Sequence, residues 1–351
     1  MVKYSAIGIM SGTSLDGVDL AGCEFTHQDE SWNFRILAAE TIPYDENWRS
    51  LLGKAHLLHG LELTRLDADY GRYLGKLCYD FIFKHHLHPA IIASHGHTVF
   101  HQPAQGFTLQ IGSGAQIAAQ TRITTVCDFR SLDVALGGQG APLVPVGDML
   151  LFAHYPFCLN IGGFANLSFN KNGKRTAFDV CPANFVLNSL AKKTGNEFDE
   201  NGKLAASGNV IPELFDRLNQ LDFYHKNPPK SLGREWVETN ILPIFSENYH
   251  PVDLLRTMVE HIAFQIAAAT KHAESAEILV TGGGAKNVFL VNRLATFTKH
   301  KVVIPDSLII DYKEALVFAF LGVLRMTEQP NCLVSVTGAD IDNIGGAVYS
   351  F

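Results

Sequence analysis

The chain has 351 residues, of which 47% are hydrophobic and 18% are charged, and its formal net charge at pH 7 is −7. This length favours two domains, and this composition is sufficient for a large buried core. The acidic balance and the absence of a long Lys/Arg run exclude the usual footprint of a nucleic-acid-binding protein, so we expect no nucleic-acid partner.

No membrane segment is predicted either. The amino terminus enters a predicted strand directly, without the apolar core of a signal peptide, and no run of about 18 apolar residues follows. We therefore expect a soluble, cytoplasmic protein that does not bind membranes. The six cysteines lack Cys-x-x-Cys spacing, which argues against a zinc site or a disulfide framework.

The first predicted element is a β-hairpin over residues 7–25, in which two apolar runs flank a turn of glycine and hydroxyl residues. Glycines allow close approach to the main chain, and consecutive N–H groups in a turn suit phosphate oxygens. An ordinary surface turn is the alternative interpretation. A third strand over 33–42 and an amphipathic helix over 61–87 follow, the latter from apolar residues spaced by three and four.

A short apolar strand over 90–93 leads into a polar stretch that contains His95, His97 and His101. Polar residues at the carboxyl end of a buried strand are typical of ligand contacts in open α/β sheets. A metal site is the alternative, but no carboxylate or cysteine cluster completes a ligand set. We expect a loop that faces substrate.

The middle of the chain continues with a helix around 117–119 and a strand over 123–130 that ends in charged residues. The cluster of glycines and prolines at 136–145 is typical of a crossover between two domains or of the rim of a cleft. At 158–169 the opening pattern of strand, glycine turn and strand returns. Two halves that begin alike indicate a duplicated architecture.

After a tight turn at 170–173, a strand over 176–180 brings Asp179 to its end, before a helix that starts near Pro182. Helix capping is the ordinary role of such an aspartate, whereas the neighbouring glycine turn favours a role in chemistry. Residues 185–260 are predicted to consist mostly of helices and loops, with a charged excursion at 228–235. An ordinary surface position is the alternative for its Lys230 and Arg234.

An apolar helix over 252–273 and a buried strand over 277–280 lead into three glycines at 282–284, which would let a flat or phosphorylated ligand lie on the backbone. The sequence there is neither the dinucleotide fingerprint nor a P-loop. A last helix over 311–322 is predicted to hold Asp311 and Glu314 in its first turn, where capping is the alternative role, and 345–351 ends as a strand.

Together these segments resemble the anhydro-N-acetylmuramic acid kinases, in the family's order and over nearly the whole chain. The matching stretches are 8–19, His95-Gly96 with Thr98-Val99 and His101, 109–112, 128–130, 135–145, 159–168, Pro229-Lys230-Ser231 with Gly233-Arg234-Glu235, 282–284, Glu314-Ala315 and 335–339.

The resemblance implies the α/β fold of the sugar kinase, heat-shock ATPase and actin superfamily, with two duplicated actin-like, ribonuclease H-like domains around an ATP cleft. Domain I would comprise 1–127 plus 314–351, and domain II 128–313. The family uses ATP and Mg²⁺ in peptidoglycan recycling. Its members open 1,6-anhydro-N-acetylmuramic acid with water and phosphorylate O6, giving N-acetylmuramic acid 6-phosphate. The resemblance also suggests a homodimer.

Site residues follow from the same resemblance, with Asp179 as the catalytic base. The expected nucleotide contacts are Gly12, Thr13, Ser14, Asp16, Gly17, Asp19, Asn160, Gly162, Gly163, Asn166, Gly282, Gly283 and Gly284, the last three near the adenosine. The expected amino-sugar contacts are His95, Thr98, Arg130 and Glu314. The ligands of Mg²⁺ stay open among Asp16, Asp19 and Asp179.

The chemistry is consistent with one base. Opening a 1,6-anhydro sugar resembles inverting glycoside hydrolysis, in which a carboxylate activates water and the leaving oxygen must be relieved of charge. Here the leaving oxygen is O6, and the γ-phosphoryl group can relieve it. We further hypothesise that Arg130 pairs with the lactyl carboxylate of the sugar.

Some positions depart from the family pattern. Val180-Cys181-Pro182-Ala183 replaces Thr-Gly-Pro-Gly beside the proposed base, His97 replaces a glutamine, and Ile309-Ile310 replaces Gly-Asp. Two alternatives therefore stay open: a kinase of the same fold for a different small sugar, or a nucleotide-dependent protein without catalysis.

Overall fold

The computed structural model describes residues 1–12, 15–228, 230–245 and 248–351. The chain forms two compact units, one of residues 1–151 with 312–351 and one of 152–311. The sequence analysis assigned 128–151 to the second domain, but the structure groups it with the first unit. The reason is side-chain contact, since Arg130 bonds His95 and buried Asp133 bonds Thr337.

The first unit is built on a six-stranded sheet in the order β13-β7-β4-β1-β2-β3. Strands β1, β2 and β3 are antiparallel neighbours, β4 and β7 continue the sheet parallel to β1, and β13 closes the edge antiparallel to β7. The strands are β1 (Val2–Met10), β2 (Gly17–Gln28), β3 (Ser31–Pro43), β4 (Ile91–Ser94), β7 (Thr124–Cys127) and β13 (Ala347–Tyr349). A separate hairpin consists of β5 (His97–Gln102) and β6 (Phe107–Ile111).

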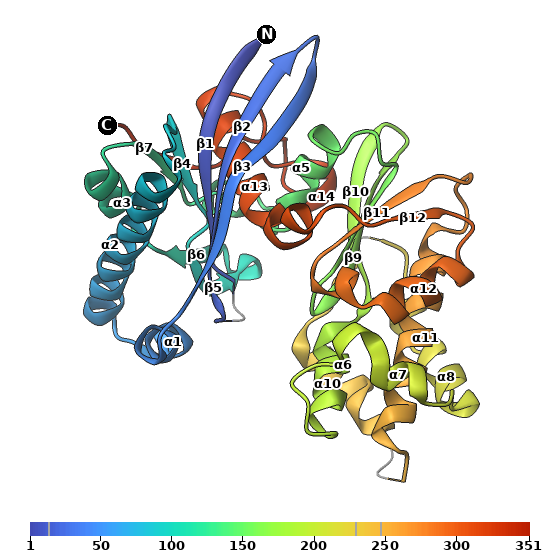
Figure 1. Ribbon diagram of the computed structural model, residues 1–351. Coiled ribbons are helices and arrows are strands. Elements are labelled where there is room, and N and C mark those ends of the chain that lie inside the picture. The colour runs from blue at the N-terminus through green and yellow to red at the C-terminus, as the bar shows by residue number, and fades with distance from the viewer. Residues whose placement is uncertain (13–14, 229, 246–247) are drawn as a thin grey trace. The chain divides into compact units, whose positions relative to one another are not determined.

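Helices cover both faces of this sheet (Figure 1). On one face Ile7 and Ile9 of β1 pack in a core with Tyr70 and Leu74 of α2. On the other, Phe320 of α13 packs against β2 and β3. The helices are α1 (Glu46–Gly53), α2 (Gly60–His85), α3 (Gly114–Thr121), α4 (Ser131–Ala135), α5 (Val144–Leu150), α13 (Ser307–Met326) and α14 (Val334–Thr337).

The second unit repeats the plan of the first. Its five-stranded sheet has the order β10-β9-β8-β11-β12, in which β8, β9 and β10 are antiparallel neighbours and β11 and β12 run parallel to β8. The strands are β8 (Phe157–Ile161), β9 (Phe164–Lys171), β10 (Lys174–Pro182), β11 (Glu277–Thr281) and β12 (Lys301–Val303). Order and direction match those of β3-β2-β1-β4-β7, which confirms the predicted duplication of an α/β architecture.

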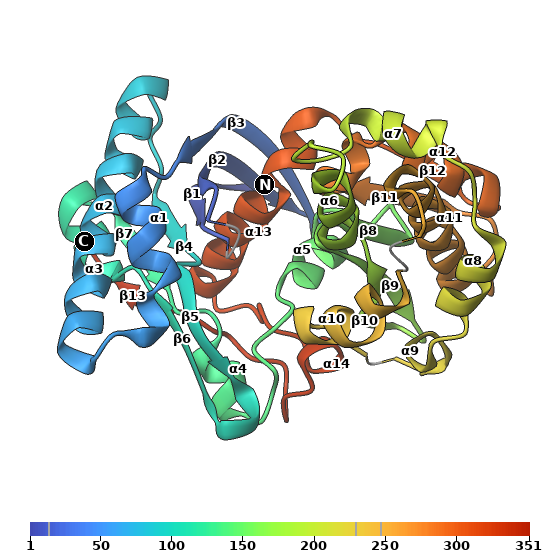
Figure 2. The same ribbon diagram turned by 90° about the horizontal axis from the view of Figure 1, so that it is seen from below.

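The helices of the second unit gather around α11, which packs against β10 (Figure 2). Leu255, Met258 and Ile262 of α11 are fully buried in the core of this unit. Its helices are α6 (Asn184–Lys192), α7 (Lys203–Ser207), α8 (Pro212–Asn219), α9 (Asp222–His225), α10 (Arg234–Asn240), α11 (Pro251–Thr270) and α12 (Val288–Phe297). The short 3₁₀ helices of the chain are η1 (Ala55–Leu57), η2 (Pro103–Gln105), η3 (Glu200–Gly202), η4 (Leu242–Ile244) and η5 (Gly283–Lys286).

The predicted hairpins and long helices are confirmed, but the start of the last helix was wrong. Helix α13 begins at Ser307, and Asp306 accepts the N–H of Ile309 at 3.0 Å in the manner of an N-cap. Asp311 and Glu314 therefore lie past the first turn and do not cap the helix. Across the part of the chain that the structure describes, none of the helices combines the length and apolarity needed to span a membrane.

Candidate functional site

The turn between β1 and β2 starts where Met10 pairs with Asp19. Ser11 donates its hydroxyl to the carbonyl oxygen of Gly96 at 3.0 Å, which ties this turn to the end of β4. The predicted contacts Thr13 and Ser14 lie outside the described residues, between Gly12 and Leu15.

The other predicted residues of this first hairpin have local contacts as well. The N–H of Gly17 donates to the Asp16 carboxylate at 3.0 Å, and Asp19 accepts the Thr41 hydroxyl at 2.6 Å. A Cβ on Gly17 would lie 2.5 Å from the carbonyl oxygen of Ile42. Close pairing with β3 thus requires glycine at position 17, whether or not this residue contacts a ligand.

The turn between β8 and β9 is built from Gly162 and Gly163, and it is fastened to the start of α6. The Gly163 carbonyl accepts N–H groups from Ala183 and Phe185, and the Gly162 carbonyl accepts that of Asn184. A Cβ built on either glycine would meet no atom nearer than 3.7 Å. Protein packing therefore leaves space beside this turn, as the approach of a phosphate group requires.

The glycine turn at 282–284 packs directly on this second hairpin. Gly282 has a φ of +80°, and a Cβ there would lie 2.6 Å from the side-chain oxygen of Asn160. A Cβ on Gly284 would overlap the side chain of Ile161. Two motifs more than a hundred residues apart in the sequence thus pack against each other within the second unit.

Asp179 lies in β10 beside a β-bulge, opposite Asn166 of β9. Its neighbours Phe178 and Val180 are buried in the core, so the alternation of the strand turns the Asp179 side chain to the opposite face of the sheet. One carboxylate oxygen accepts the Asn166 side-chain amide, and the other accepts the N–H of Leu232 at 2.7 Å. Among the described residues neither of these donors belongs to a helix, so the contacts seen here are not those of a helix cap.

Burial of Asp179 raises the pKa of its carboxyl above the ordinary value, while the hydrogen bonds from Leu232 and Asn166 lower it. Desolvation disfavours the charged form and the two donors favour it. A carboxylate with a raised pKa and a fixed orientation is suited to accept a proton from water. Asn166, predicted to contact nucleotide, here holds this carboxylate.

In the first unit, His95 and Arg130 form one buried network with the glycine-rich stretch after α4. Arg130 Nη2 and Nε lie 2.8 and 3.1 Å from His95 Nε2, and Nη1 donates to the Gly140 carbonyl at 2.6 Å. His95 Nδ1 lies 2.8 Å from the carbonyl of Gly96, which assigns the ring proton to Nδ1. Burial, followed by the Arg130 charge, lowers the pKa of His95 to about 3.

The network limits what Arg130 can offer a ligand. Its Nε and Nη2 edge is occupied by His95, so a carboxylate would have to approach the Nη1 and Nη2 end. Burial lowers the pKa of Arg130 to about 10, whereas the negative charge of Glu314 raises it. Arg130 and Glu314 thus lie near each other, as the sequence analysis expected of two sugar contacts.

Thr98 and His97 lie at the start of β5 and border a small cavity of about 190 Å³ in the first unit, next to Leu15. Among the described residues, His97 Nδ1 is buried without a hydrogen-bond partner. His101 instead contacts the Thr108 hydroxyl. Because the described residues contain no metal-binding cluster and His95 is engaged by Arg130, the metal alternative for these histidines finds no support.

Sequence reasoning missed two groups that build the site. Asp133 is fully buried and accepts hydrogen bonds from Gly140, Thr337 and Asn343, which fixes the loop that Arg130 bonds. Lys230 and Leu232 contact Asp179 through backbone groups, which carry no sequence signal. Of these groups, only Asp133 leaves a signal in the sequence, as a charged residue within a helix.

Known proteins match this chain in sequence over nearly its whole length. A family model described as anhydro-N-acetylmuramic acid kinase matches residues 4–351. The anhydro-N-acetylmuramic acid kinase of Actinobacillus pleuropneumoniae serotype 7 is 36% identical over 373 residues, covering 99% of this chain and all of that protein. The kinase of the same name from Pseudomonas fluorescens is 37% identical over 369 residues, with 98% of each chain covered.

Solved structures give weaker matches. An activator of 2-hydroxyisocaproyl-CoA dehydratase from Clostridium difficile has a TM-score of 0.44 at 14% identity, covering 92% of this chain and 96% of its own. A ROK family glucokinase from Streptomyces griseus has a TM-score of 0.43 at 10% identity, with 91% and 99% covered. The full-length sequence matches carry the assignment, and by them this chain belongs to the anhydro-N-acetylmuramic acid kinase family.

Proposed function

We propose that this protein uses ATP to open 1,6-anhydro-N-acetylmuramic acid and to phosphorylate its O6, giving N-acetylmuramic acid 6-phosphate and ADP. The observation that carries the proposal is the oriented carboxylate of Asp179 within a chain that matches this kinase family from end to end. The reaction belongs to peptidoglycan recycling. Cytoplasmic localisation and a homodimer stay predictions.

Asp179 is proposed to act as the general base. It takes a proton from a water molecule that attacks the anomeric carbon, while the bond from that carbon to O6 breaks and O6 takes the γ-phosphoryl group of ATP. The phosphoryl group thus neutralises the leaving O6, a role that a proton from a general acid would otherwise have. A carboxylate whose pKa is raised by burial supports this role.

The open glycine turn at Gly162 and Gly163, with Gly282 to Gly284 packed beside it, is proposed to receive ATP phosphates and the adenosine side of the nucleotide. Mg²⁺ fits a site of this kind, because it is usually held by one or two carboxylates together with substrate phosphates. Asp16, Asp19 and Asp179 stay the candidates. When bound, the ion would neutralise charge on the transferring phosphoryl group.

Arg130 is proposed to bind the lactyl carboxylate through its Nη1 and Nη2 end, with neutral His95 fixing the guanidinium plane. Glu314 and Thr98 are proposed to contact the same sugar. An Arg130→Lys enzyme with an unchanged KM for the anhydro sugar would contradict the carboxylate assignment.

One observation favours a second candidate, a kinase of the same fold for another small sugar. His97 stands where the family usually has glutamine, and its buried Nδ1 has no partner in the described part of the chain. An acceptor at that place would suit a different pattern of sugar hydroxyls. The departures at Val180, Cys181 and Ala183 favour it less, because all three side chains are buried in the core.

The decisive experiment compares the wild type with Asp179→Asn in ADP release from ATP and Mg²⁺ with 1,6-anhydro-N-acetylmuramic acid, followed by mass analysis of the sugar. We expect the ring-opened 6-phosphate from the wild type and a fall of at least about a hundredfold in kcat for the variant, the lower range for loss of a general base. Far-ultraviolet circular dichroism checks that the variant folds.

Three other outcomes have distinct meanings. Wild-type ADP release that depends on a different sugar supports the second candidate. ATP binding without turnover on any sugar tested supports a non-catalytic protein. A variant as active as the wild type removes Asp179 from the mechanism while leaving the reaction in place.

A further inference from the structure

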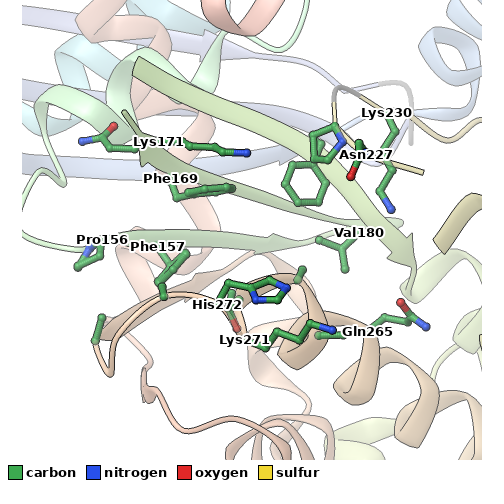
Figure 3. A pocket seen from close by; sticks show the side chains of 18 of the residues that line it. Pro156, Phe157, Phe169, Lys171, Val180, Asn227, Lys230, Gln265, Lys271 and His272 are labelled. Atoms are coloured by element: carbon green, nitrogen blue, oxygen red, sulfur yellow. The ribbon is translucent and has the colours of Figure 1, made fainter. Parts of the chain in front are cut away.

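A cavity of about 900 Å³ in the second unit has no part in the proposed reaction (Figure 3). It lies where β8 begins, at Pro156 and Phe157, and is bordered by the end of β9 and by residues 268–276, which include the last turn of α11. The glycine turn at 162–163 follows the other end of β8. The lining side chains of Phe178 and Val180 lie on the face of β10 opposite to that of Asp179, so the sheet separates the cavity from the proposed catalytic carboxylate.

The charge of this cavity is opposite to that of the whole chain. It is lined by four lysines, Lys171, Lys226, Lys230 and Lys271, and Glu274 is the one acidic residue among the described residues that line it. The lysines come from three separate segments of the chain, and Figure 3 labels three of them, Lys171, Lys230 and Lys271. A concave site with an excess of positive charge on a chain of net charge −7 attracts anions.

The inner wall of the cavity is aromatic. The rings of Phe157 and Phe169 have centroids 5.6 Å apart, and Phe169 lies edge-on to Phe178 at 6.2 Å. Val180 continues this wall along β10. Apolar and aromatic walls with a few polar groups are typical of sites for small organic molecules. The cavity therefore suits a molecule with both a ring and an anionic group.

The cavity is also connected to Asp179 through one short segment. Lys230 borders the cavity, with its Nζ 4.5 Å from the centre of the Phe223 ring and 3.1 Å from the Phe223 carbonyl oxygen. The backbone carbonyl of Lys230 accepts the N–H of Asp179 at 3.0 Å, and the N–H of Leu232 donates to the Asp179 carboxylate. A ligand that draws Lys230 toward itself would move the groups that orient Asp179.

We infer that this cavity is a regulatory site for a small ring-bearing organic anion of the phosphate ester class, and that its occupancy changes the rate of the reaction at Asp179 through Lys230 and Leu232. The binding part stands independently of the proposed function. The regulatory part rests on it, because it requires Asp179 to be the catalytic base.

Binding is tested with phenyl phosphate as the probe, by calorimetric titration of the full-length protein. We expect saturable binding that weakens with added salt, and at least about fivefold weaker binding to the double variant Lys171→Glu/Lys271→Glu. Lys193→Glu, an exposed lysine of the same unit outside the cavity, is the matched control and should bind as the wild type does. Lys171→Gln/Lys271→Gln repeats the test without charge reversal.

Neutral benzyl alcohol should not bind detectably, and inorganic phosphate should bind more weakly than phenyl phosphate because it lacks the ring. Equal affinity of the wild type and both double variants for phenyl phosphate would overturn the site. Binding of benzyl alcohol as tight as that of phenyl phosphate would also overturn the site, since the lysines would then have no role.

Regulation is tested by kcat at saturating ATP and sugar, where a competitor at the active site has no effect. We expect phenyl phosphate to change the wild-type kcat at least about twofold and to leave the kcat of the double variants unchanged. An unchanged wild-type kcat despite binding would overturn the coupling. Binding by a wild type that has no kinase activity would instead count against the proposed function and leave the site standing.

Discussion

At the scale of single residues, the environment of Asp179 decides what its carboxylate can do. Burial of the side chain raises the pKa of the group, and two donors keep its orientation fixed. The donors differ in kind, because Asn166 contributes a side chain and Leu232 a backbone N–H. The Asn166 donor can be removed by shortening its side chain, whereas removal of the Leu232 donor requires a proline that also constrains the backbone, so Asn166 is the residue that tests the arrangement.

We predict that Asn166→Ala lowers kcat by about ten- to a hundredfold, less than loss of Asp179, the proposed base, with the KM for ATP nearly unchanged. Asn166 stabilises the charged carboxylate, so its removal raises the pKa of Asp179 further. The acidic limb of the kcat profile should therefore move to higher pH. The measurement is kcat between pH 4 and pH 9. A shift of the acidic limb by about one pH unit corresponds to a tenfold change in the ionisation equilibrium of Asp179.

Asn188→Ala provides the matched control, because Asn188 is an exposed asparagine of α6 in the same unit. Its pH profile should coincide with that of the wild type. An Asn166→Ala profile that also coincides, even with reduced kcat, would mean that Asn166 has only a structural role.

At the scale of elements, the contact between β1 and α13 fixes the first unit. Gly8 lies in the middle of β1, with Ile7 and Ile9 directed into the core on the other face. A Cβ on Gly8 would overlap the carbonyl oxygen of Ala315 in α13. The helix lies so close to the strand that only glycine fits, and the neighbouring residue Glu314 is held near Arg130 by the same packing.

We predict that Gly8→Val lowers the free energy of unfolding by more than about 3 kcal/mol, since backbone cannot yield as a flexible side chain does. Urea denaturation followed by circular dichroism measures it. Gly60→Ala is the control, because a Cβ at Gly60 in the first turn of α2 meets no atom within 4 Å. A stable Gly8→Val protein would show that α13 can shift away from β1 at little cost.

At the scale of the whole molecule, the two units repeat one sheet plan but differ in how the chain builds them. The second unit is a single continuous segment, 152–311, with its own core around α11. The first needs two segments, because β13 and most of α13 come from 312–351. Continuity of the chain should therefore decide which unit can fold by itself.

We predict that the isolated fragment 152–311 folds cooperatively, whereas the fragment 1–151 does not, because it lacks the helix that covers one face of its sheet. The measurements are circular dichroism and urea unfolding of both fragments beside the full-length chain. Cooperative unfolding of 1–151 would show that β1 to β7 need no cover from α13.

The sequence by itself determined the hairpins, the long helices, the duplication and the family, since these depend on local periodicity and on glycine turns that are contiguous in the chain. It also singled out Asp179, Arg130 and His95. It misplaced residues 128–151, because buried Asp133 bonds Thr337 far along the chain. It also missed the cap of α13, although the contact of Asp306 with the N–H of Ile309 is local, because Asp311 and Glu314 offered a competing helix start.

Only the tertiary structure decided how the chosen residues act together. It showed that Asn166 and Leu232 orient Asp179, that His95 occupies one edge of Arg130, and that Gly282 lies against Asn160. The physical reason is that hydrogen bonds between distant segments, and backbone donors above all, leave no mark in the order of residue types. The cationic cavity beside Lys230 could not be predicted from the sequence either, because its lysines come together only after β9, α9 and α11 have packed.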